Sequence, residues 1–184
     1  MARATRQVRS SGPPGVPRRH HLRRDAADDP CGEGDRVVTA SADYTRANDE
    51  SRARLRAIIS RLDRGQLATN VMEGWSASTL LAHVAFWDRF TLQRWQSRLA
   101  GNVVPDIGPL ADALNDAAVP MWNAVPPEVA TREAAAAAEA VDRFVAALPP
   151  DVIAEVLAEG RPRWIARSEH RREHLEQIER ALAR

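Results

Sequence analysis

Lysine is absent from this sequence of 184 residues, so all 26 basic side chains are arginine. We interpret that bias, together with the abundant alanine, as the mark of a GC-rich genome. A single cysteine, Cys31, excludes a disulfide framework and a cysteine-rich zinc site. No apolar run approaches the roughly 18 to 20 residues of a membrane span, which argues against a membrane partner. The formal net charge of +1 argues against nucleic acid as the main partner.

Charge is distributed unevenly along the chain. Residues 1–41 contain eight arginines and five acidic residues, whereas residues 42–184 contain 18 arginines and 20 acidic residues. The first stretch has no apolar periodicity and lacks the apolar segment of a signal peptide, so we predict a disordered basic tail. Two alternatives stay open. The tail could be an arm for nucleic acid or membrane, or a start-site artefact with a GTG start codon at Val37 or Val38.

Helices are expected throughout residues 42–184, because strand signals are nearly absent there. That part has one tyrosine and no alternating segment, and its apolar residues recur at helical spacing. With limits set by capping Ser, Gly and Pro, the expected helices cover about residues 42–64, 76–100, 110–124, 126–148, 151–158 and 164–183. We expect a strain or break at Pro120. Four long amphipathic helices predict an all-α four-helix bundle.

Three of the five histidines lie in this helical part, at His83, His170 and His174. The last two are four residues apart on a face that continues to Ile178 and Ala181, so both are expected to face the core. His83 falls on the apolar stripe of its own helix. Burying three imidazoles without partners is costly, and a shared metal ion bound at about 2.0–2.1 Å would remove that cost. Hydrogen-bonded core histidines are the alternative.

The segment from His170 to His174 also matches H-x-x-E-H, the inverted zinc-protease motif. In that motif a glutamate acts on a metal-bound water and a further acidic ligand lies well downstream. Ten residues follow His174, too few for that ligand, so a protease is not predicted. We expect Glu173 at the surface, paired with arginines along its helix.

Two motifs, in this order, resemble the DinB/YfiT-like superfamily, which includes the N-terminal domain of mycothiol-dependent maleylpyruvate isomerase and related thiol S-transferases. They are Trp75-Ser76-Ala77-Ser78-Thr79-Leu80-Leu81-Ala82-His83-Val84, and Arg161-Pro162-Arg163-Trp164 followed by His170 and His174. The resemblance covers about residues 42–184. It implies a divalent metal (zinc, or alternatively nickel or iron) held by the three histidines. It also implies a low-molecular-weight thiol as cosubstrate, whose sulfur the metal activates toward a small electrophile.

Three more residues are candidates for substrate binding. Trp87 follows His83 by one turn, Asn115 lies where the family often has an asparagine, and Arg163 belongs to an arginine group before the last helix. Core packing, helix capping and solvation are their respective structural alternatives, and solvation is also expected for Arg167. Asp88 is expected on the far side of its helix from the histidine, so it is not predicted as a ligand. No catalytic residue is predicted.

The resulting prediction is a cytoplasmic, metal-binding transferase or isomerase that depends on a thiol. A single free cysteine fits the reducing cytoplasm. The expected partners are a small-molecule substrate and the thiol, and a homodimer is compatible with the family. Two other functions stay open: a module that holds a small molecule without turnover, and a bundle whose histidines are purely structural.

Overall fold

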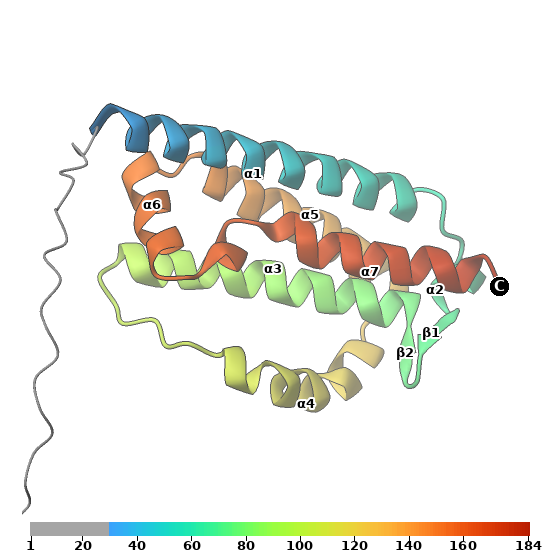
Figure 1. The fold of residues 1–184 in the computed structure, drawn as a ribbon. Helices are drawn as coiled ribbons and strands as arrows, with labels where there is room; N and C mark the ends of the chain where they lie inside the picture. The colour runs from blue at the N-terminus through green and yellow to red at the C-terminus, as the bar shows by residue number, and fades with distance from the viewer. Residues whose placement is uncertain (1–29) are drawn as a thin grey trace, which may run out of the picture.

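The computed structural model describes residues 30–184 (Figure 1). Its helices are α1 (Pro30–Ile59), α2 (Arg64–Leu67), α3 (Ala77–Leu99), α4 (Ala111–Asn123), α5 (Pro127–Ala146), α6 (Pro150–Ala158) and α7 (Arg167–Leu182). Two 3₁₀ turns, η1 (Gly108–Leu110) and η2 (Pro162–Trp164), and a hairpin of β1 (Asn70–Met72) and β2 (Trp75–Ser76) complete it. The predicted all-α class is confirmed. Among the residues described, no helix has the length and apolar character needed to cross a membrane.

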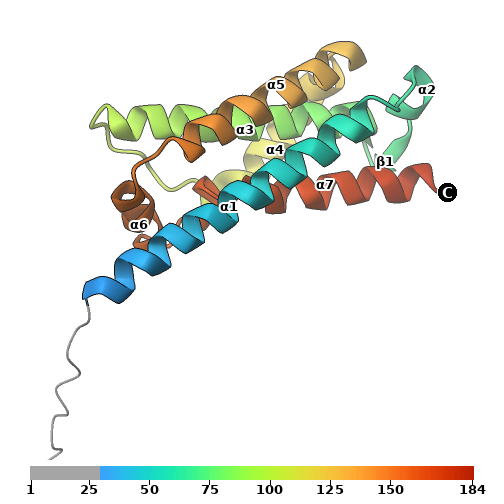
Figure 2. The same cartoon turned by 90° about the horizontal axis from the view of Figure 1, so that it is seen from above.

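The four long helices α1, α3, α5 and α7 lie side by side (Figures 1 and 2). Helix α3 packs against α5 and α7, and α1 packs against the same two helices. Helices α3 and α7 run in opposite directions, as the colours of Figure 1 show. Helix α4 lies outside this group, along α3. Helix α3 is therefore covered on three sides, which explains why so much of it is buried.

Local capping sets the ends of α3. Ser76 is the N-cap, and its hydroxyl accepts a hydrogen bond from the backbone N–H of Thr79, as the sequence predicts. The helix ends at Leu99, and Gly101 follows with φ +80°, a left-handed conformation that favours glycine. These caps fix which turns of α3 face the neighbouring helices.

The start of α7 is held by a side chain from α1. Asn48, which is 2% exposed, accepts a hydrogen bond from the backbone N–H of Ser168. Its amide nitrogen donates to the carbonyl of Ile165. Helix α7 has no side-chain cap of its own, so Asn48 satisfies backbone groups that would otherwise be unpaired in the interior.

Helix α1 starts earlier than the sequence predicts, at Pro30 instead of Ala42, and it ends earlier, at Ile59. Proline is well suited to a first helical turn, and a helix extends easily beyond a segment that is already packed. Apolar periodicity therefore placed the start too late. The rest of the predicted tail, residues 1–29, lies outside the described residues. The structure therefore does not test the start-site hypothesis.

The structure differs from the predictions at two other places: the break considered at Pro120 is absent, and a short hairpin is present that was not predicted. Helix α4 continues through Pro120 without a break. The carbonyl of Asp116 loses its helical partner there, but both residues are exposed, so water can replace the missing bond. The hairpin β1–β2 was not predicted, because two strands of three and two residues are too short to show alternation.

Candidate metal centre

Three histidine rings meet between α3 and α7. His83 comes from α3, and His170 and His174 lie one turn apart on α7. Each Nε2 atom lies 3.1 Å from the Nε2 atoms of the other two rings. The three nitrogens therefore form an equilateral triangle. Within the described part of the chain, these residues are the group of metal-ligating side chains close enough to share one ion.

Hydrogen bonding among the three rings cannot satisfy this triangle. A neutral imidazole Nε2 carries either a hydrogen or a lone pair, so it is either a donor or an acceptor. With three mutually close nitrogens, at least one pair must be donor against donor or acceptor against acceptor. A cation that accepts all three lone pairs resolves that conflict.

The size of the triangle fits a transition-metal ion. Ligand nitrogens at about 2.1 Å from zinc would lie about 3.0 Å apart at right angles and about 3.4 Å apart in a tetrahedron. The observed 3.1 Å lies between these values. Three protein ligands on one side would leave at least one position for another molecule, as in catalytic sites and unlike closed structural sites.

All three imidazoles are held in the neutral form that binds metal. Burial lowers the pKa of His83 from 6.5 to about 3, and repulsion from His174 and Arg167 adds to the effect. Burial likewise lowers the pKa of His170 well below its usual value and lowers the pKa of His174. Metal binding at neutral pH therefore needs no proton release from these rings.

The outer ring nitrogens have different surroundings. Nδ1 of His174 lies 2.8 Å from the Gln177 amide oxygen, which can only accept, so Nδ1 carries the hydrogen and Nε2 keeps its lone pair. Nδ1 of His170 lies 3.5 Å from a guanidinium nitrogen of Arg167, a distance too long to fix the tautomer of the ring. Nδ1 of His83 is buried and has no hydrogen-bond partner within residues 42–184, whose side chains the structure describes.

Aromatic rings surround His83. Its ring centre lies 5.2 Å from that of Trp75, 4.9 Å from that of Trp122 and 6.2 Å from that of Trp87. The hairpin, α4 and α3 each supply one of these tryptophans. Trp75 is the first residue of the earlier sequence motif, whereas sequence reasoning missed Trp122. The spacing of seven residues from Asn115 could have revealed it, because both then share the face of α4 toward α3.

The structure brings two of the three predicted substrate-binding residues together. The indole N–H of Trp87 donates to the side-chain oxygen of Asn115 at 3.0 Å. Arg163 lies apart from them on η2, where it is exposed, and its backbone carbonyl accepts a hydrogen bond from Arg167. A substrate role remains a prediction for all three.

The expectation of a solvated Arg167 was wrong. This residue is 6% exposed, and its Nε donates to Asp88 at 2.9 Å. Asp88 is not close enough to join the histidine triangle, but it is fully buried. Arg171, which sequence reasoning did not consider, is also fully buried and donates from Nε to the same carboxylate at 2.8 Å. The expectation that Asp88 lies on the far side of α3 from His83 was also wrong, because a step of five residues turns the helix by about 140° and both side chains still reach α7.

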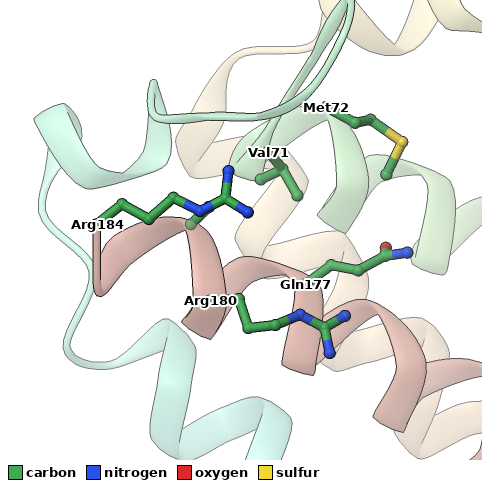
Figure 3. A pocket seen from close by; sticks show the side chains of 6 residues that line it. Val71, Met72, Gln177, Arg180 and Arg184 are labelled. Atoms are coloured by element: carbon green, nitrogen blue, oxygen red, sulfur yellow. The ribbon is translucent and has the colours of Figure 1, made fainter.

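A pocket of about 250 Å³ lies near the C-terminal end of α7 (Figure 3). Its lining comes from β1 and the end of α7, with Val71, Met72, Gln177, Arg180, Ala181 and Arg184. Gln177 is shared, because it lines the pocket and also contacts His174.

Comparison with known families gives one match. A family described as the mycothiol maleylpyruvate isomerase N-terminal domain matches residues 48–175, a range that contains all three histidines. This confirms the resemblance predicted from the two motifs. Comparisons with curated proteins and with solved structures give no match.

Proposed function

Since the chain belongs to the mycothiol maleylpyruvate isomerase N-terminal domain family, we propose that it binds one divalent metal ion through His83, His170 and His174. The observation that carries this proposal is the triangle of Nε2 atoms 3.1 Å apart, which suits an ion and cannot be satisfied by the rings alone. Zinc suits three neutral imidazoles, and nickel or iron are alternatives.

The proposed activity is transfer of a low-molecular-weight thiol, of the mycothiol type, to a small electrophile, or an isomerisation that uses such a thiol. When bound, the metal would lower the pKa of a coordinated thiol and so make a nucleophile available near neutral pH. The chain itself supplies neutral nitrogen ligands. The tryptophans pack around the His83 ring and give it an apolar surround. Trp87 and Asn115 are the candidates for orienting a substrate.

A second candidate function uses the same centre without turnover, as a module that holds a small molecule. Support for it comes from the composition of the candidate centre: among the described residues, the group that could hold an ion consists of three histidines and contains no carboxylate. Both functions need the metal. Histidines with a purely structural role would not.

Metal analysis of protein purified without a histidine tag tests the proposal. We expect about one ion per chain after dialysis against zinc, and loss of that ion in His83→Ala and His174→Ala. The double variant His20→Ala/His21→Ala is the matched control, because it removes two histidines that are not among the proposed ligands and should keep full metal content. Wild-type protein that retains no zinc, nickel or iron would overturn the proposal.

A thiol-conjugation assay then separates the two functions. Metal-loaded protein is incubated with a mycothiol-type thiol and a set of small electrophiles, and product formation is followed. Turnover that disappears in His83→Ala supports the transferase or isomerase. Stoichiometric binding without turnover supports the holding module.

A further inference from the structure

Helix α3 contacts α7 through two polar side chains in the same manner. His83 reaches His170 and His174, which are one turn apart on α7. Five residues further along α3, Asp88 reaches Arg167 and Arg171, which are also one turn apart. Each arginine precedes one of the histidines by three residues. Because the two helices run in opposite directions, the two contacts are consecutive steps along one helix pair (Figure 1).

The Asp88 contact permits little movement. One carboxylate oxygen accepts from Arg167 Nε at 2.9 Å, and the other accepts from Arg171 Nε at 2.8 Å. Asp88 and Arg171 are fully buried. A shift of α7 by one turn, about 5.4 Å, would leave a buried charge without a partner, which is strongly unfavourable. Apolar packing alone is non-directional and defines such a register poorly.

We infer that Asp88 is a positioning residue for the metal centre: through Arg167 and Arg171 it fixes α7 against α3 in the register where the three Nε2 atoms converge. The inference rests on the proposed function, since it assigns Asp88 a role toward the same centre. Asp88 contacts none of the three histidines and ligates nothing itself. Its effect is on the geometry of their triangle.

Asp142 provides a matched control. Its carboxylate also binds Arg171, with two bonds of 2.8 Å, and it is nearly as buried as Asp88. It lies on α5, however, so it ties α7 to α5 and not to α3. Removing either charge should destabilise the fold, and only the Asp88 change should disturb the histidine triangle.

The test compares Asp88→Asn with Asp142→Asn. Zinc affinity is measured by competition with a chromophoric chelator, and the visible spectrum of the Co²⁺-loaded protein reports ligand geometry. We expect Asp88→Asn to weaken zinc binding about tenfold or more and to change the Co²⁺ spectrum, as outer-sphere changes commonly do. Asp142→Asn should keep the zinc affinity and the Co²⁺ spectrum of the wild type. Equal behaviour of the two variants would overturn the inference.

Variants that lose a buried charge can fail to fold. The pair Asp88→Glu and Asp142→Glu then decides, because both keep the charge and lengthen the connection by one methylene. We expect Asp88→Glu to fold, to bind zinc more weakly and to alter the Co²⁺ spectrum, with Asp142→Glu unchanged. An Asp88→Glu protein with wild-type affinity and spectrum contradicts a positioning role.

A metal-free measurement separates this inference from the proposed function. Nuclear Overhauser contacts between the imidazole protons of His83 and His174 report the register in chelator-treated protein. We expect these contacts in the wild type and in the Asp142 variants, and their loss in the Asp88 variants. If the wild type binds no metal, the proposed function fails. The Overhauser contacts still decide whether Asp88 sets the register.

Discussion

His83 is the residue on which the centre depends most. It is 3% exposed, lies against three tryptophans and faces both histidines of α7. Its Nδ1 has no hydrogen-bond partner among the described residues, so protonation of this ring would place an unsolvated charge in the interior. This makes the stability of the metal-free protein sensitive to acid.

We predict that metal-free protein loses stability as the pH falls from about 7 to about 5.5. An unfolded histidine has a pKa of 6.5 and binds a proton in this range, whereas the folded pKa of His83 is about 3. The unfolded state therefore binds more protons, and its relative free energy falls by up to about 1.4 kcal/mol per pH unit for each such histidine. The contribution of neutral His83 to the unfolding free energy is fully present above pH 6.5. It is lost progressively as the pH falls toward the folded pKa of about 3. Urea unfolding at pH 7 and at pH 5.5, in the presence of a chelator, measures this change in unfolding free energy.

The control for this pH effect is His83→Gln, which cannot take up the proton and should show a shallower dependence of unfolding free energy on pH. Addition of zinc should raise the stability of the wild type without flattening the dependence, because bound metal keeps protons off the folded ligands while the unfolded histidines still bind them. Identical unfolding free energies at the two pH values, in chelator, would show that the histidines are not held neutral.

Gln177 should affect the metal affinity of the centre although it is not itself a proposed ligand. Its amide oxygen accepts from Nδ1–H of His174 and so keeps the Nε2 lone pair free for a metal. We expect Gln177→Ala to weaken zinc affinity about tenfold, measured by chelator competition. Gln96→Ala, on an exposed position of α3, should have no effect. Equal affinities for the two variants would show that the Gln177 contact does not orient the ring.

Among the elements, α4 lies outside the four long helices and still contacts the histidine centre. Its Trp122 packs against His83. One residue later, Asn123 accepts a hydrogen bond from the hydroxyl of Thr79 and donates to the carbonyl of Gly74 at 3.1 Å. The end of α4 is thus bound to both the start of α3 and the hairpin. This anchor holds Trp122 in place over the histidine.

We predict that Asn123→Ala loosens α4 while the four long helices stay folded. Two hydrogen bonds worth about 1 kcal/mol each are lost, so amide exchange in α4 should accelerate about tenfold or more. Hydrogen exchange followed by mass spectrometry on peptides covering residues 111–123 measures this. Asn102→Ala, in the exposed loop after α3, is the control. Unchanged exchange in α4 would mean that Trp122 alone secures it.

The elements also show what the sequence could and could not predict. Long helices follow from local spacing and caps, so α3, α5 and α7 were predicted closely, and the histidines were placed correctly because their neighbours are apolar. The buried charges were not found. Asp88 and Arg171 look like surface residues until their partnership is known, and they lie 83 residues apart in the chain. Pairing over such a distance has no local signal.

For the molecule as a whole, Arg171 is the central connection. This fully buried side chain comes from α7 and donates to Asp88 on α3 and to Asp142 on α5. One of its guanidinium nitrogens also lies 3.4 Å from the hydroxyl oxygen of Ser51 on α1. Arg171, itself on α7, therefore contacts the other three long helices, and it is the cation that the two buried carboxylates share.

We predict that Arg171→Leu costs about 3–5 kcal/mol of unfolding free energy, because Asp88 and Asp142 would be left partly uncompensated in the interior. Urea unfolding followed by far-ultraviolet circular dichroism measures the loss. Arg180→Leu, an exposed position on the same helix, should change stability by less than about 0.5 kcal/mol. A cost below about 1 kcal/mol for Arg171→Leu would mean that Arg167 and Arg52, which also pair with these carboxylates, compensate them without it.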